Sequence, residues 1–174
     1  MNNSWPPEQE ELLAQIGLTL LLLQDLEHIF SHCMRLIFGD KSMLSLKDFL
    51  SPEKRTLGKM KHELGLAVTL DDDFDDFLKT LIRNRNLFVH HLREQTWFNI
   101  ETEQGQNSTY RFLIELFHQI ESATKIFQAF ALKQAKQYNM QEVPYGNELR
   151  ERGIFQDLEE NYIPYIDSLI KGKK

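Results

Sequence analysis

The spacing of proline constrains this chain more than any other feature, because proline breaks helices and two long stretches contain none. The five prolines stand at positions 6, 7, 52, 144 and 164. In the two longest intervals, apolar residues recur three and four positions apart, as on one face of a helix. They are Leu12, Ile16, Leu20, Leu23, Phe30, Met34 and Ile37 in the first, and Leu113, Leu116, Phe117, Ile120, Ala123, Phe127 and Phe130 in the second. This pattern predicts two long helices, over about 8–38 and about 109–138.

Shorter helices are predicted around these two. A short apolar segment covers 44–50, and a helix over about 53–64 follows with Ser51 as its N-cap. A third helix opens in the aspartate-rich run 69–76, where negative charge favours a helix N-terminus, and continues to about Arg93. Residues 95–108 are expected to be a loop. A last helix or pair covers about 147–170, interrupted by Pro164.

No segment alternates in the manner of a strand, so we expect an all-α fold, an antiparallel bundle of four to five helices. With 174 residues, the chain is long enough for one domain over 1–174 with its own core. Leu18, Leu21 and Leu22 add apolar surface off the main stripe of the first helix. We therefore expect this helix to be central to the bundle or shared with a second subunit.

Charge and cysteine content narrow the function classes. The net charge of -6 argues against a protein that coats nucleic acid through its overall charge. The single cysteine, Cys33, excludes an internal disulfide framework and a multi-cysteine zinc site. The N-terminus has no basic region of a secretory signal, and the apolar run 18–23 is too short for a bilayer. We expect a soluble, cytoplasmic protein with no membrane partner and no cofactor.

The third predicted helix carries an arginine in the middle of its apolar face. At about 100° per residue, that face gathers Phe74, Leu78, Leu81, Phe88 and Leu92, and Arg85 falls among them. A guanidinium is rarely buried without a partner. Either Arg85 pairs with Asp25 or Glu27, or its head reaches solvent at a subunit seam, or it serves a chemical function.

A second stripe of the same helix is polar and basic. It consists of Lys79, Arg83, Asn86, His90 and Arg93, spaced four, three, four and three apart. Such a stripe is most often a solvated helix face. In a chain of net negative charge, it is also the surface on which a phosphodiester backbone would be favourable.

The two stripes meet at Arg85, Asn86 and His90, which are the candidate catalytic residues. Arginine holds a phosphate by two hydrogen bonds, and histidine exchanges a proton near neutral pH. Asn86 lies four residues before His90 and can orient the imidazole or the substrate. These groups suit cleavage of RNA without a metal, in which the 2′-OH attacks the adjacent phosphorus. A symmetric dimer would supply the second histidine.

The run Arg-Asn-Leu-Phe-Val-His at 85–90, late in a long helix of an all-α bundle, resembles the HEPN superfamily. Its ribonucleases carry an arginine and a histidine separated by four to six residues. The resemblance implies a helical bundle, a homodimer whose two motifs face one cleft, and metal-independent endoribonuclease activity. It also implies a toxin or an anti-phage defence effector, with RNA as substrate and an antitoxin or a defence-complex protein as partner.

Within this resemblance, other residues remain candidates. Arg83 with His90 forms the six-residue version of the motif, and His91 follows directly. Lys79, Arg83, His91 and Arg93 are expected to contact RNA. One large HEPN toxin group has a tyrosine two residues after the histidine, which a partner nucleotidyltransferase modifies. Leu92 stands there, which puts such regulation in doubt.

Three other groups of residues suggest sites of their own. His28 and His32 with Cys33 have a spacing that can hold zinc, but a helix-surface histidine pair is the simpler account. The aspartates of 71–76 lack the glycine and glutamate of a calcium loop and suit N-terminal capping better. A second basic cluster, at Lys54, Arg55, Lys59 and Lys61, could extend an RNA track. The alternative function is a non-enzymatic helical interaction module: an antitoxin, an immunity protein or an inactive HEPN scaffold.

Overall fold

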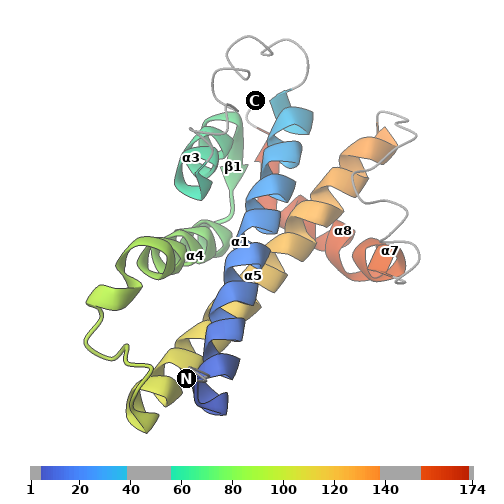
Figure 1. Cartoon of the computed structure of the whole chain (residues 1–174). Helices are drawn as coiled ribbons and strands as arrows, with labels where there is room; N and C mark the ends of the chain where they lie inside the picture. The colour runs from blue at the N-terminus through green and yellow to red at the C-terminus, as the bar shows by residue number, and fades with distance from the viewer. Residues whose placement is uncertain (1–4, 39–55, 138–153, 173–174) are drawn as a thin grey trace.

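Two long helices organise the chain, as shown in a computed structural model that describes residues 5–38, 56–137 and 154–172 (Figure 1). They are α1 (Pro7–Phe38) and α5 (Glu103–Gln137). The remaining described helices pack around this pair. The all-α helical bundle predicted from the sequence is confirmed. The predicted segment 44–50 lies outside the described residues.

The seam between α1 and α5 follows a strict alternation of four- and three-residue steps, the spacing of a coiled coil. It is formed by Leu12, Ile16, Thr19, Leu23, Leu26, Phe30 and Cys33 of α1, and by Thr109, Leu113, Leu116, Ile120, Ala123, Phe127 and Phe130 of α5. At its centre, the rings of Phe30 and Phe127 stack with centroids 4.0 Å apart. Both threonines in the seam are buried, and each donates its hydroxyl to a carbonyl one turn earlier.

This seam corrects two predicted core positions. Leu20 and Phe117 are exposed, whereas their neighbours Thr19 and Leu116 are buried. The reason is the period: steps averaging 3.5 residues select Thr19 and Leu116, while a looser three-or-four pattern also admits their apolar neighbours.

The direction of α5 also differs from the expectation of antiparallel neighbours. Both α1 and α5 run upward in Figure 1, and Phe30 meets Phe127 while Thr19 lies near Leu113 at the other end. The pair is therefore parallel. Antiparallel neighbours need only a short connection, but here the chain returns through α3 and α4 before α5 begins.

The back of α1 is open to solvent within this chain. Leu18 is 45% exposed and Leu21 is 59% exposed, so the helices of the described segments do not bury them as a central position requires. A second subunit on this face stays a prediction. The stretch Pro7–Met34 is also long and apolar enough to cross a membrane by length and composition, a test that core helices of soluble proteins pass as well.

The segment between the long helices forms α3 (Leu57–Ala67), β1 (Val68–Leu70) and α4 (Asp72–His91), followed by a 3₁₀ turn, η3 (Leu92–Glu94). Helix α3 has Thr56 as its N-cap instead of the predicted Ser51, because the Thr56 hydroxyl accepts the N–H of Lys59. Helix α4 is capped by Asp71, whose carboxylate accepts the N–H of Asp73. The predicted role of this aspartate run in N-terminal capping is thereby confirmed for Asp71.

The C-terminal segment packs on the other side of α5. It contains α7 (Ile154–Asp157), a π-helical turn, η4 (Leu158–Tyr162), α8 (Ile163–Leu169) and β2 (Ile170–Gly172). Pro164 follows directly after the π-helical turn, inside a helical run that continues from Ile154 to Leu169, and the N–H of Ile163 there bonds to the carbonyl of Leu158. The predicted interruption at Pro164 is therefore a local π-turn and not a break in the helix. Strand β2 pairs antiparallel with β1. The sequence did not indicate this pairing, because three residues are too few for an alternating pattern to show.

The seam yields a stability prediction. Replacing Phe127 by alanine removes the ring that stacks on Phe30 and should lower the free energy of unfolding by about 3–5 kcal/mol. The matched control is Phe117→Ala in the same helix, where the side chain is 40% exposed, and the loss should be about 1 kcal/mol or less. Urea unfolding followed by circular dichroism measures both. Equal losses would show that the α1–α5 seam is wrongly placed.

Candidate active site

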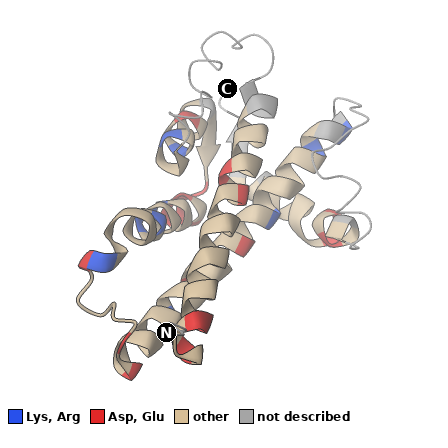
Figure 2. Cartoon of the chain, viewed as in Figure 1, with Lys and Arg blue, Asp and Glu red and all other residues tan. Residues whose placement is uncertain are grey.

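Helix α4 has the two faces that the sequence predicted. Phe74, Leu78, Leu81 and Phe88 are buried against the rest of the bundle, and Leu92, just beyond the helix, is partly buried. The polar stripe is exposed throughout, at Lys79, Arg83, Asn86, His90 and Arg93. Figure 2 shows Lys and Arg along α4 and at its C-terminal end, with Asp and Glu at its N-terminal end.

Arg85 leaves the buried face of α4 and binds a carboxylate on α1. Its Nη2 lies 2.9 Å and its Nε 3.0 Å from Oε1 of Glu27. The side chains are 14% and 20% exposed, so this ion pair is largely withdrawn from water. Of the two partners that the sequence left open, the structure selects Glu27, while Asp25 is exposed. The pair ties α4 to α1.

The other end of the guanidinium reaches the remaining candidate catalytic residues. Arg85 Nη1 donates to Oδ1 of Asn86 at 3.2 Å and lies 3.1 Å from Nε2 of His90. Arginine carries only donors, so His90 must accept at Nε2 and hold its proton on Nδ1. Arg85 therefore contacts both Asn86 and His90, and Glu27 is its third partner.

This arrangement uses most of the donors of Arg85. A guanidinium has five N–H bonds. Two point at Glu27, one at Asn86 and one at His90, which leaves a single N–H of Nη2. A two-bond grip on a phosphate, as expected for Arg85 from the sequence, therefore requires at least one of these contacts to open.

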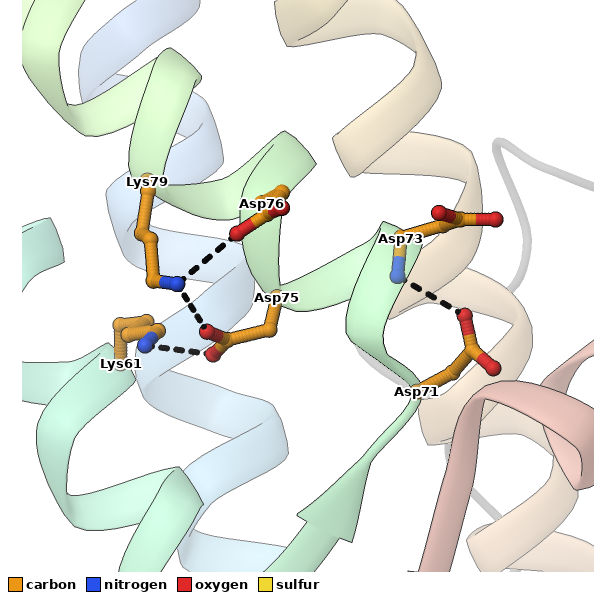
Figure 3. A network of polar contacts seen from close by, with 6 residues as sticks. All are labelled: Lys61, Asp71, Asp73, Asp75, Asp76 and Lys79. Atoms are coloured by element: carbon orange, nitrogen blue, oxygen red, sulfur yellow. Dashed lines mark hydrogen bonds and ion pairs between the residues drawn. The ribbon is translucent and has the colours of Figure 1, made fainter.

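The remaining basic groups of α4 divide into paired and unpaired ones. Lys79 binds Asp75 at 2.9 Å and Asp76 at 2.8 Å, and Nδ1 of His91 lies 2.9 Å from a carboxylate oxygen of Glu94 (Figure 3 shows the lysine contacts). Within the described part of the chain, the side chains of Arg83 and Arg93 have no ion pair. Among these groups, the positive charge left open to an anionic partner thus lies mainly on Arg83 and Arg93.

Asp75 joins α4 to α3 through two lysines (Figure 3). Lys61 of α3 and Lys79 both contact its carboxylate, and these hydrogen bonds hold the pKa of Asp75 below its usual value. Lys61 is therefore engaged in structure and less suited to the predicted RNA track. Lys54 and Arg55 of that track lie outside the described residues.

One buried polar residue of α4 had not been singled out from the sequence. Asn84 is buried, and its Nδ2 donates to Oε1 of Gln119 on α5 at 3.1 Å. The available signal was its helical position, three residues after Leu81 and four before Phe88, on the apolar face. Asn84 orients α4 on α5 just as Arg85 orients it on α1.

The part of the chain that the structure describes brings no group of three metal ligands to the zinc alternative at α1. His28 and His32 lie together, with their Nε2 atoms 3.1 Å apart, in keeping with a helix-surface pair. Cys33 is buried and donates from Sγ to the carbonyl of Phe127, and burial raises the pKa of its thiol. Among the described residues, no three His, Cys, Asp or Glu side chains gather as a metal site requires.

No family model, curated protein or solved structure matches this chain. The assignment of a function consequently depends on the residues and their geometry.

The pair around Asp75 gives a pH-dependent prediction. Because the folded state holds the pKa of Asp75 below its unfolded value of about 3.9, the carboxylate stabilises the fold above about pH 4, and this contribution is lost as the pH falls through the lowered folded value. Asp75→Asn should therefore be less stable than the natural chain near neutral pH, with a difference that shrinks in acid.

Urea midpoints measured from neutral pH downward test this. The control is Asp76→Asn, since the Asp76 side chain is more exposed and, among the described residues, forms an ion pair with Lys79 alone. A difference for Asp75→Asn that stays constant with pH would show that packing, and not charge, sets its contribution.

Proposed function

We propose that this protein is a metal-independent endoribonuclease of the HEPN type that acts as a homodimer. The observation that carries the proposal is the cluster of Arg85, Asn86 and His90 on the exposed side of α4, with Arg85 Nη1 only 3.1 Å from His90 Nε2. An arginine and a histidine in contact, beside exposed Arg83 and Arg93, supply charge and proton transfer at one place.

The chemistry follows from these groups. A base removes the proton of the 2′-OH, the oxygen attacks the adjacent phosphorus, and an acid protonates the departing 5′-oxygen. Guanidinium groups stabilise the charge that builds on the phosphorus oxygens. One copy offers one histidine in contact with Arg85, since His91 is turned to Glu94. A second copy facing the first would supply the other proton-transfer group.

The biological role proposed here comes from the HEPN resemblance. It is that of a cytoplasmic toxin or anti-phage defence effector, restrained by an antitoxin or by a defence-complex protein. Leu92 replaces the tyrosine that one toxin group presents for modification. We therefore expect restraint by binding and not by a nucleotidyltransferase.

A second candidate function is supported by a different observation. An open groove of about 380 Å³ lies between α1 and α5, lined by residues that include Thr19, Tyr110, Ile114 and Phe117. Exposed apolar side chains of this kind mark interaction surfaces. With Arg85 held by Glu27 as in a structural ion pair, the chain could serve as a non-enzymatic interaction module.

Cleavage assays separate the two candidates. Purified protein should cut RNA in the presence of EDTA and leave a 2′,3′-cyclic phosphate or its hydrolysis product. His90→Ala should lower the rate by at least about 10²-fold, the usual range for loss of positioned acid–base catalysis. His62→Ala serves as the control, because it removes an exposed imidazole of α3 that takes no part in the Arg85 cluster. Activity that needs a divalent ion, or that survives in His90→Ala, would exclude the proposed mechanism.

The roles of the two arginines can be separated by lysine variants. Arg85→Lys should be severely impaired, because one ammonium cannot hold Glu27, Asn86 and His90 with the planar geometry of a guanidinium. Arg83→Lys keeps an exposed positive charge and should retain most activity, while Arg83→Ala should flatten the salt dependence of RNA binding by about one contact.

Cleavage rates and RNA affinities across salt concentrations measure these effects, with circular dichroism to confirm folding. If Arg83→Lys is inactive and Arg85→Lys is only less stable, then Arg85 is a structural residue. The catalytic pair would then be Arg83 with His90.

A further inference from the structure

The contact between Arg85 and His90 closes the site against an anion. The lone pair of His90 Nε2 is occupied by the N–H of Arg85 Nη1, and the same Nη1 also binds Asn86. An oxyanion that approaches between these two residues meets His90 Nε2, which cannot donate, and Arg85 Nη1, whose two N–H bonds are both in use. The atoms expected to bind a phosphate are therefore bound to each other.

The charges around His90 explain why opening this contact needs more than an anion. Glu27 of α1 neutralises the guanidinium of Arg85, and a neutral His90 adds no charge. On its own helix, His90 is followed by His91, with ring centroids 6.2 Å apart, and His91 contacts Glu94 of η3. Arg93 of η3, three positions after His90, is exposed and has no ion pair among the described residues.

An anion therefore meets a cluster whose charges largely cancel. Displacement of Glu27 is an unfavourable route, because it leaves a shielded carboxylate without its partner and close to a second negative charge. A proton on His90 is the more favourable route. It turns Nε2 from an acceptor into a donor and adds one positive charge where the anion binds.

We propose that the oxyanion of a phosphodiester enters between Arg85 and His90 only together with one proton. The N–H of Arg85 Nη1 turns from His90 Nε2 to one oxygen of the anion. Nε2 takes up a proton from solvent and donates it to a second oxygen, while Glu27 keeps its hold on Nε and Nη2. No covalent bond other than this N–H is formed. The inference rests on the proposed function for the ligand class, but the coupling does not require RNA to be cut.

The coupling predicts whether His90 donates or removes a proton in catalysis. A histidine that is protonated when the phosphodiester binds is ready to donate to the departing 5′-oxygen. His90 of the copy that grips the phosphate through Arg85 is then the acid, and the base comes from the second copy. The binding of one proton with each anion also makes affinity fall as the pH rises.

The test uses thymidylyl-thymidine, a phosphodiester that keeps one negative charge near neutral pH and has no 2′-OH to attack. Nuclear magnetic resonance titrations of ¹⁵N-labelled protein report both the affinity and the protonation of each imidazole. Between about pH 7 and about pH 8, affinity should fall by close to tenfold, the slope for uptake of one proton. Saturation with the dinucleotide near pH 7.5 should move the His90 ring nitrogens to doubly protonated shifts.

Two variants separate this coupling from general electrostatics. His90→Gln keeps an acceptor for Arg85 but cannot take a proton, so its affinity should be almost independent of pH. His62→Gln removes an exposed imidazole of α3, outside the Arg85 cluster, and should keep the full pH dependence. A pH-independent affinity in the natural chain, an unchanged slope in His90→Gln, or no binding in the millimolar range near pH 6 would each overturn the inference.

These outcomes are separate from those of the cleavage assay. If the protein binds the dinucleotide with one proton but does not cut RNA, the coupling is supported and the proposed function is wrong. If it cuts RNA but binds the dinucleotide without a proton, the proposed function is supported and the coupling is wrong.

Discussion

The parallel seam between α1 and α5 is the interaction on which the rest of the structure depends. Its steps of four and three residues bury one continuous row of side chains from each helix, with Phe30 stacked on Phe127 at the centre. A pair of helices joined by one seam leaves a surface on each side of the seam that other helices can cover. Helix α4 packs across one flank through Arg85 to α1 and Asn84 to α5, and the C-terminal helices cover part of another face of α5.

The candidate site is a consequence of how α4 is held. Arg85 starts on the buried face of the helix, pairs with Glu27 across the interface, and still reaches Asn86 and His90 on the exposed face. One side chain thus links packing and chemistry. Because of this dual role, a structural Arg85 and a catalytic Arg85 would make the same contacts. They differ in the activity expected of the lysine variants.

Much of the fold was predictable because helical periodicity is local. Helix α1 was expected over about 8–38 and is observed at Pro7–Phe38, and the buried and exposed faces of α4 follow the rotation of about 100° per residue. The sequence predicted Leu20 in the core where the structure has Thr19. The Thr19 hydroxyl is hydrogen-bonded to the carbonyl of Gln15 and can be buried, but a search for apolar residues does not include threonine. The short strands β1 and β2 carry too few residues to leave a pattern.

The sequence by itself determined that the chain is helical and that Arg85, Asn86 and His90 lie close together near the C-terminal end of one helix, because residues this close on a helix cannot be separated. Only the tertiary structure decided that α5 runs parallel to α1, that Glu27 and not Asp25 binds Arg85, and that four of five guanidinium N–H bonds are already used. These depend on how distant segments pack. A carboxylate that lies 58 positions earlier in the chain leaves no periodic signal near the arginine that it binds.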